Sequence, residues 1–166
     1  SVEKIISFDM GGTSTDVALM DGAISTITEG HIDRFPVGVP MVDMHTIGAG
    51  GGSIACIDSG GMLKVGPQSA GADPGPASYG KSGESATVTD ANLVLGRLLE
   101  SSELADGLSL DLGKARAAIE RLSVPLNLTI EETALGIVTI ANEHMAKAIR
   151  LISVNRGHDP KEFVLA

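Results

Sequence analysis

The sequence is poor in cysteine and in aromatic residues. Its 166 residues include one cysteine, Cys56, which excludes an internal disulfide framework and a metal cluster built from cysteines alone. Such cysteine usage is typical of the reducing cytoplasm, where we expect the protein to act. Aromatic residues make up only 2% of the chain and hydrophobic residues 43%. The core must therefore be packed mainly by Ile, Leu, Val, Met and Ala.

Basic residues are also scarce. Twelve Lys and Arg stand against 21 Asp and Glu, and the formal net charge is −9. Nonspecific binding to nucleic acid requires clustered positive charge, so we expect no nucleic-acid partner. A bound phosphate must then be held locally, by backbone N–H groups, a helix terminus or a metal ion. The sequence also has no apolar run of about 20 residues, the length of a membrane span, and we expect no membrane partner.

The chain is expected to form a single domain, part of a larger protein, with three successive segments: 1–29, 30–86 and 87–166. In the first segment, apolar runs at 4–9 and 15–20 flank a glycine turn. The dipeptide Asp21-Gly22 then predicts a hairpin leading into a third strand at 23–28. The first segment is therefore predicted to be an antiparallel three-strand meander.

The second segment contains most of the glycines and prolines and only short apolar runs. Long stretches without helical periodicity are usually either functional or disordered, and the interleaved Ile, Val and Met favour packing. We expect an ordered, loop-rich insertion with short strands.

The third segment has helical periodicity. A short helix is predicted from about Thr89, a second over 113–122, and a third over 130–155, opened by a capping box at Thr129 to Glu132. A final apolar run at 163–166 is typical of a strand. Strands followed by helices and a last strand predict an α/β fold with helices packed on the sheet.

The glycine turn at the end of the first strand has the composition of a phosphate-binding loop. Glycines let the backbone approach an anion closely, exposed N–H groups and hydroxyls donate to phosphate oxygens, and carboxylates hold a hydrated Mg²⁺. The alternative is an ordinary hairpin turn rich in Gly and Thr. Candidates for phosphate binding are Gly11, Gly12, Thr13, Ser14 and Thr15; candidates for catalysis, and for Mg²⁺ through bound water, are Asp9 and Asp16.

A second glycine cluster allows two interpretations. Gly50, Gly51, Gly52 and Ser53 are candidates either for cradling a phosphate or for letting the chain pass through a crowded crossing. Just before them, Asp43 and His45 form an Asp-x-His pair that is a candidate metal ligand or acid–base pair, with a structural histidine as the alternative.

The hairpin resembles the phosphate loops of the actin, sugar kinase and heat-shock chaperone superfamily. Longer stretches resemble the hydantoinase A / 5-oxoprolinase family in order and spacing. These stretches are 43–55 (DMHTIGAGGGSIA), 65–76 (VGPQSAGADPGP), 87–98 (TVTDANLVLGRL), 141–146 (ANEHMA) and 156–160 (RGHDP).

This resemblance implies a ribonuclease H-like (actin-like ATPase) fold, of which the chain would carry the second phosphate loop. It further implies ATP and Mg²⁺ as cofactors, a small cyclic amide as substrate, and a hydantoinase B-like partner subunit or domain. ATP would activate the amide by phosphorylation before hydrolysis. The alternatives are a subunit of a related ATP-dependent ketone carboxylase and a non-catalytic, nucleotide-dependent regulatory module.

Overall fold

The computed structural model describes residues 3–28, 30–32, 35–101 and 107–166, which group into two compact units. The first unit is formed by Ser1–Asp9, Thr15–Ile47 and Met145–Ala166. The second is formed by Met10–Ser14 and Gly48–His144. Each unit thus combines segments that are distant in the sequence, and the glycine turn belongs to the second unit while its flanking strands belong to the first.

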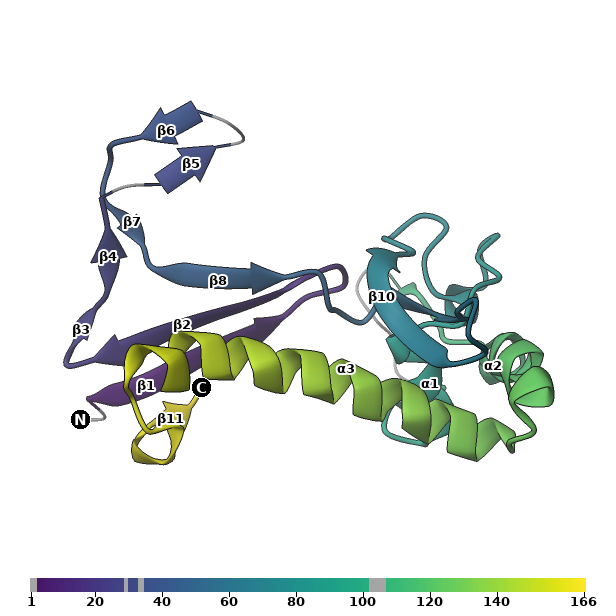
Figure 1. Ribbon diagram of the computed structural model, residues 1–166. Helices are drawn as coiled ribbons and strands as arrows, with labels where there is room; N and C mark the ends of the chain where they lie inside the picture. The colour runs from purple at the N-terminus through teal and green to yellow at the C-terminus, as the bar shows by residue number, and fades with distance from the viewer. Residues whose placement is uncertain (1–2, 29, 33–34, 102–106) are drawn as a thin grey trace. The chain divides into compact units, whose positions relative to one another are not determined.

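The first unit is built on a five-stranded sheet (Figure 1). Its order is β11-β1-β2-β3, and β8 also pairs with β2. Strands β3 and β8 are antiparallel to β2, whereas β11 is parallel to β1. The strands are β1 (Lys4–Met10), β2 (Thr15–Asp21), β3 (Ala23–Ile24), β8 (Met44–Ile47) and β11 (Val164–Leu165).

The predicted meander is correct for its first two strands but wrong for most of the third. Gly22 adopts φ +74° and turns the chain back as expected, yet β3 pairs only with Met20 and Asp21. The neighbour of β2 near the glycine turn is β8 instead, from Thr15 opposite Ile47 to Ala18 opposite Met44. The turn residues specified a reversal, but strand pairing beyond it depended on packing.

The segment between β3 and β8 forms short ladders of its own. Strand β4 (Thr26–Ile27) pairs with β7 (Met41–Val42), and β5 (Gly30–Ile32) pairs with β6 (Phe35–Val37), both antiparallel.

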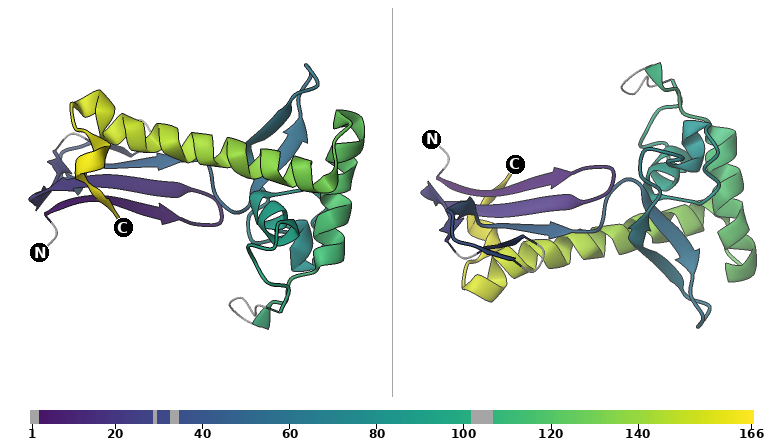
Figure 2. Two further views of the ribbon diagram at one scale, coloured as in Figure 1. Left: turned by 90° about the horizontal axis from the view of Figure 1, so that it is seen from below. Right: turned by 90° about the horizontal axis from the view of Figure 1, so that it is seen from above.

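One face of the sheet is covered by the C-terminal end of α3 (Ile130–Ile152), as Figures 1 and 2 show. Burial alternates along β2, as expected for a strand with one covered face. The first unit's core joins Ile6, Val17 and Leu19 of the sheet to Ala148 and Ile152 of the helix. Short turns η3 (Val154–Arg156) and η4 (Pro160–Glu162) then lead into β11.

The second unit confirms the predicted helices. After the hairpin of β9 (Ser53–Ile57) and β10 (Leu63–Ser69) and the turn η1 (Ala77–Tyr79) come α1 (Val88–Val94), α2 (Leu112–Leu126) and the first part of α3. Thr129 and Glu132 form the capping box that opens α3. No single helix among the described residues has the length and apolarity to cross a membrane, although the bent pair of α2 and the helix after it passes by length and composition.

Candidate nucleotide site

The glycine turn of the second unit, residues 10–14, is closed by one internal bond and leaves its remaining donors open. The N–H of Gly11 donates to the Ser14 carbonyl oxygen at 2.8 Å. Within the described part of the chain, the N–H groups of Gly12, Thr13 and Ser14 have no hydrogen-bond acceptor. Gly12 and Thr13 are exposed and Ser14 is half-buried. Successive open N–H groups in a turn are the donor set that binds phosphate oxygens.

The second glycine cluster packs against this turn. The N–H of Gly51 donates to the Gly11 carbonyl at 3.0 Å, and that of Gly52 to the Gly12 carbonyl at 2.6 Å. A Cβ on Gly50 would lie 2.7 Å from the Gly11 oxygen, and one on Gly52 would lie 2.9 Å from the Gly12 oxygen. Side chains at these positions would therefore collide with backbone, so glycine is required by the close approach.

The N–H groups of the second cluster are already bonded within the protein. That of Gly50 donates to the Ser53 Oγ at 2.9 Å, and that of Ser53 returns to the Gly50 carbonyl. Of the two interpretations of this cluster, the crowded crossing is therefore the one with direct geometric support. Contact between Gly50–Ser53 and a cofactor stays a prediction, as does phosphate binding by Thr15, which is fully buried.

The helix α1 begins behind the second cluster. Thr87 is its N-cap, and the Asp90 carboxylate accepts a hydrogen bond from the Thr87 N–H, which completes a capping box. The structure gives Asp90 a second role that no local sequence pattern indicated. The fully buried Asp90 also accepts the N–H groups of Ala77 and Ser78, at 3.2 and 2.8 Å, and so binds η1 to the helix.

The two predicted acidic residues lie in the first unit, on the face of the sheet away from the α3 core. The Ser7 Oγ donates to the Ala18 carbonyl across β1 and β2 at 3.5 Å. Asp9 and Asp16 each lie two residues nearer the turn than these partners, so the hairpin brings both carboxylates to one face. Asp9 is exposed, and the Asp16 Oδ1 accepts the Thr46 hydroxyl at 2.5 Å. Exposed carboxylate oxygens are ligands that suit Mg²⁺ or its bound water.

Asp43 and His45 lie elsewhere in the first unit and have other partners. Both terminal nitrogens of Arg156 donate to the Asp43 carboxylate. His45 is paired with the fully buried Val17, so it lies on the face opposite to Asp16. Within the described ranges, no group of three or more His, Cys, Asp or Glu is placed to hold a metal ion. A metal at Asp43 and His45 stays a prediction, and the geometry shows an ion pair between Asp43 and Arg156.

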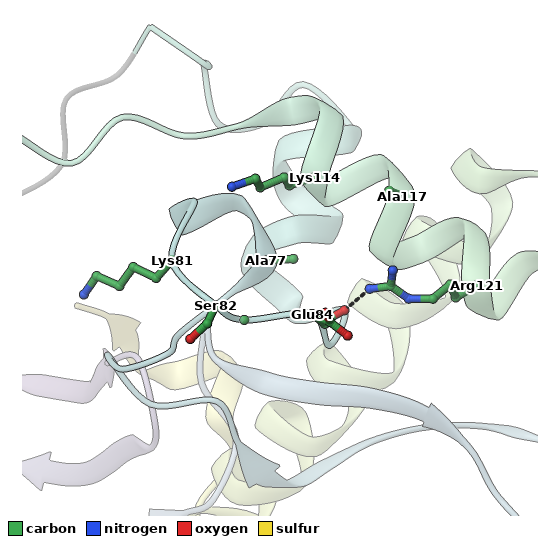
Figure 3. Close-up of a pocket in the computed structure, with 8 residues that line it drawn as sticks. Ala77, Lys81, Ser82, Glu84, Lys114, Ala117 and Arg121 are labelled. Carbon is green, nitrogen blue, oxygen red and sulfur yellow. Dashed lines mark hydrogen bonds between the residues drawn. The ribbon is translucent and has the colours of Figure 1, made fainter.

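A pocket of about 290 Å³ in the second unit was not indicated by any motif (Figure 3). It lies between α2 and the loop after η1, and three cations surround it. Each donates to a backbone carbonyl: Lys81 to Ala72, Lys114 to Gly80 and Arg121 to Glu84. The bonds of Lys114 and Arg121 hold the loop against the helix, and that of Lys81 joins the loop to the segment before η1, which accounts for the three cations without a ligand.

Comparison with known proteins identifies relatives from the family that the sequence resembles. A family model described as Hydantoinase/oxoprolinase matches residues 1–166. The chain is 45% identical to caprolactamase subunit alpha of Pseudomonas jessenii, over 99% of the chain and 24% of that protein. It is 46% identical to the 5-oxoprolinase PfmaA of Pestalotiopsis fici, over 95% of the chain and 13% of that protein. The chain therefore spans a quarter or less of the length of these relatives.

Two solved structures are also similar. The crystal structure of the ATP-dependent caprolactamase from Pseudomonas jessenii superimposes with a TM-score of 0.90 at 45% identity. A nucleotide-free acetone carboxylase, described as carrying out ATP-dependent acetone carboxylation, superimposes with a TM-score of 0.88 at 31% identity. Each match covers 99% of this chain and 24% of the solved chain.

Proposed function

Because the chain belongs to the hydantoinase/oxoprolinase family, we propose that it forms part of the ATP-binding and phosphoryl-transfer site of a larger enzyme that hydrolyses a cyclic amide. The observation that carries the proposal is the turn at 10–14, whose N–H groups at Gly12, Thr13 and Ser14 have no acceptor in the described protein. This donor set fits a phosphate, which the net charge of −9 would otherwise repel.

The residues have separate tasks in this proposal. The open backbone N–H groups of Gly12, Thr13 and Ser14, with hydroxyls of the segment Gly11–Thr15, orient the phosphates of ATP. The carboxylates of Asp9 and Asp16, which flank the turn in the sequence, hold the water shell of Mg²⁺. When bound, that ion neutralises charge on the phosphates. Phosphoryl transfer demands mainly positioning and electrostatics, so the site requires no protein nucleophile.

The proposed reaction has three steps. The amide oxygen attacks the γ-phosphorus, and ADP leaves. Water then adds to the activated carbon and the ring nitrogen leaves as the amine, so that the ring opens to an acyl phosphate. A second water attacks the acyl phosphate, which gives the carboxylate and free phosphate. Relatives named caprolactamase and 5-oxoprolinase support this substrate class. The name "subunit alpha" supports a further subunit, for which we propose a hydantoinase B-like partner.

The fold of the first unit is compatible with the same proposal. A ribonuclease H-like domain has antiparallel strands followed by a helix and a strand parallel to the first. Strands β1, β2 and β8, helix α3 and the parallel β11 follow that order. We therefore propose a ribonuclease H-like, actin-like ATPase fold for this part of the protein.

A ketone carboxylase is the second candidate, favoured by the similarity to acetone carboxylase. It would use the same phosphate site to phosphorylate an enol oxygen. A non-catalytic nucleotide-dependent module is the third. Relatives named caprolactamase and 5-oxoprolinase favour an enzyme over such a module.

The test uses the full-length protein with any subunit that co-purifies. Mg·ATP binding is measured by calorimetry, and phosphate release is measured with and without hydantoin, 5-oxoproline, caprolactam or a ketone plus bicarbonate. Release stimulated by a cyclic amide supports the proposal. Stimulation only by ketone and bicarbonate would replace it with the carboxylase, and binding without any stimulation would replace it with the regulatory module.

Asp9→Asn is the matched variant for this test, since the side chain is exposed and its shape is retained. We expect about tenfold weaker Mg·ATP binding with an unchanged melting temperature, because an amide loses the charge that attracts the hydrated cation. Unchanged affinity would remove Asp9 from the site.

A further inference from the structure

The hydroxyl of Thr89 lies behind the phosphate turn, separated from it by one residue, Gly51. Thr89 is in the first turn of α1 and is half-buried. Its N–H and its Oγ1 both donate to the Gly51 carbonyl oxygen, at 2.8 and 2.9 Å. One peptide carbonyl therefore receives two donors from the same residue, which fixes both its position and its orientation.

The other end of Gly51 reaches the turn. Its N–H donates to the Gly11 carbonyl at 3.0 Å, while the following N–H, of Gly52, donates to the Gly12 carbonyl. The Gly52 carbonyl is held in turn by the N–H of Ala70 at 2.8 Å. The carbonyls of the turn are thus held by a segment that is itself anchored to α1 and to the end of β10.

The packing leaves the backbone little conformational freedom between Thr89 and the phosphate turn. A Cβ on Gly51 would lie 2.8 Å from the Thr89 Oγ1, and the neighbouring glycines have no room for a side chain next to the turn. When the carbonyls of Gly11 and Gly12 are fixed, the peptide planes that follow them are constrained as well. Those planes carry the open N–H groups of Gly12 and Thr13.

We propose that Thr89 is a positioning residue for the phosphate turn, acting through Gly51 on the peptide planes that present N–H groups to the nucleotide. The inference rests on the proposed function and adds a residue to it. Thr89 does not touch the phosphate; its two bonds to one carbonyl pre-order the donors, so that less ordering is required when ATP binds.

Thr89→Val tests the inference because it retains the β-branched shape and removes only the hydroxyl. Thr133→Val is the matched control. The Thr133 Oγ1 also donates to a backbone carbonyl at 2.9 Å, in the same unit, but its acceptor is Thr129 at the start of α3. Both variants lose one hydrogen bond of the same kind, so a purely structural role predicts the same behaviour for both.

The measurements are the Kd for Mg·ATP and hydrogen–deuterium exchange of the peptide that carries Gly51 and Gly52, in the full-length protein. We expect Thr89→Val to raise the Kd about three- to tenfold and to speed exchange at these glycines by a similar factor. Thr133→Val should change neither, and Thr89→Ser should restore both.

The outcomes separate this inference from the proposed function. Wild-type protein that binds Mg·ATP while Thr89→Val matches it in affinity and exchange would overturn the role of Thr89 alone. Equal weakening by Thr133→Val would also overturn it, since the effect would then be general destabilisation. Wild-type protein that binds no Mg·ATP would overturn the proposed function, and the nucleotide role of Thr89 with it.

Discussion

Gly52 donates its N–H to the carbonyl oxygen of Gly12 at 2.6 Å, which joins two glycine loops that are far apart in the sequence. The contact is backbone to backbone, and it is possible only because the second loop carries no side chains at Gly50 and Gly52, where it crosses the first. The first loop supplies the open N–H groups and the second supports it from behind.

Gly50→Ala is expected to destabilise the second unit by about 1–3 kcal/mol, because the added methyl group would overlap backbone atoms of Gly11 and Gly12 that cannot move away independently. Urea unfolding followed by circular dichroism measures the change. Gly48→Ala is the control in the same loop: its Cβ would meet the Pro67 oxygen only at 3.7 Å, an ordinary contact. Equal losses for the two variants would contradict the crowded crossing.

The ion pair between Asp43 and Arg156 leads to a second prediction. The Arg156 side chain is 42% exposed and that of Asp43 is 19% exposed, so solvent screens part of the attraction. A double-mutant cycle with Asp43→Asn and Arg156→Gln should give a coupling free energy of about 1 kcal/mol, since the pair is bidentate.

The same variants test the alternative of a metal at Asp43. A divalent cation that raises the melting temperature of the wild-type protein, but not of Asp43→Asn, would favour a ligand role over the ion pair. With the ion pair alone, cations should have the same effect on both proteins.

Asp90 leads to a third prediction, about stability. Its fully buried carboxylate accepts the N–H groups of Ala77, Ser78 and Thr87. Asp90→Asn replaces one acceptor oxygen by a donor and leaves buried N–H groups without partners. We expect a loss of about 2–4 kcal/mol in the free energy of unfolding. A variant with Asp111→Asn, a half-buried cap on α2, should lose much less, and similar losses would show that only capping was affected.

The start of α3 leads to a prediction about pH. Hydrogen bonds from the Thr129 N–H and hydroxyl hold the pKa of Glu132 below its ordinary value of 4.5. A carboxyl group whose pKa is lowered by folding stabilises the folded state above its unfolded pKa. That stabilisation is lost as the pH falls through the lower, folded pKa.

Melting temperatures of wild type and Glu132→Gln, measured from pH 7 to pH 3, check this. The difference between the two proteins should be largest above about pH 5 and shrink toward pH 3. A difference independent of pH would contradict the charge-dependent capping bond.

Much of the local structure followed from the sequence. The capping pattern at Thr129, the turn at Gly22 and the apolar stripe of the last helix act over a few residues, and each predicted element is present. The composition of the turn also predicted exposed N–H groups, but glycine and hydroxyl residues at a strand end suit an ordinary hairpin turn as well as a phosphate loop. These features need only short-range hydrogen bonds and the conformational preferences of single residues.

Tertiary structure decided the partners. Strand β8, rather than the end of the predicted third strand, lies beside the half of β2 nearest the turn. The second glycine cluster packs against the first. Asp43 pairs with Arg156, and Asp90 binds the backbone of η1 as well as its own helix. Each of these contacts joins segments far apart in the chain. A local pattern shows which groups can bond, but the packing of the whole unit selects which partner they meet.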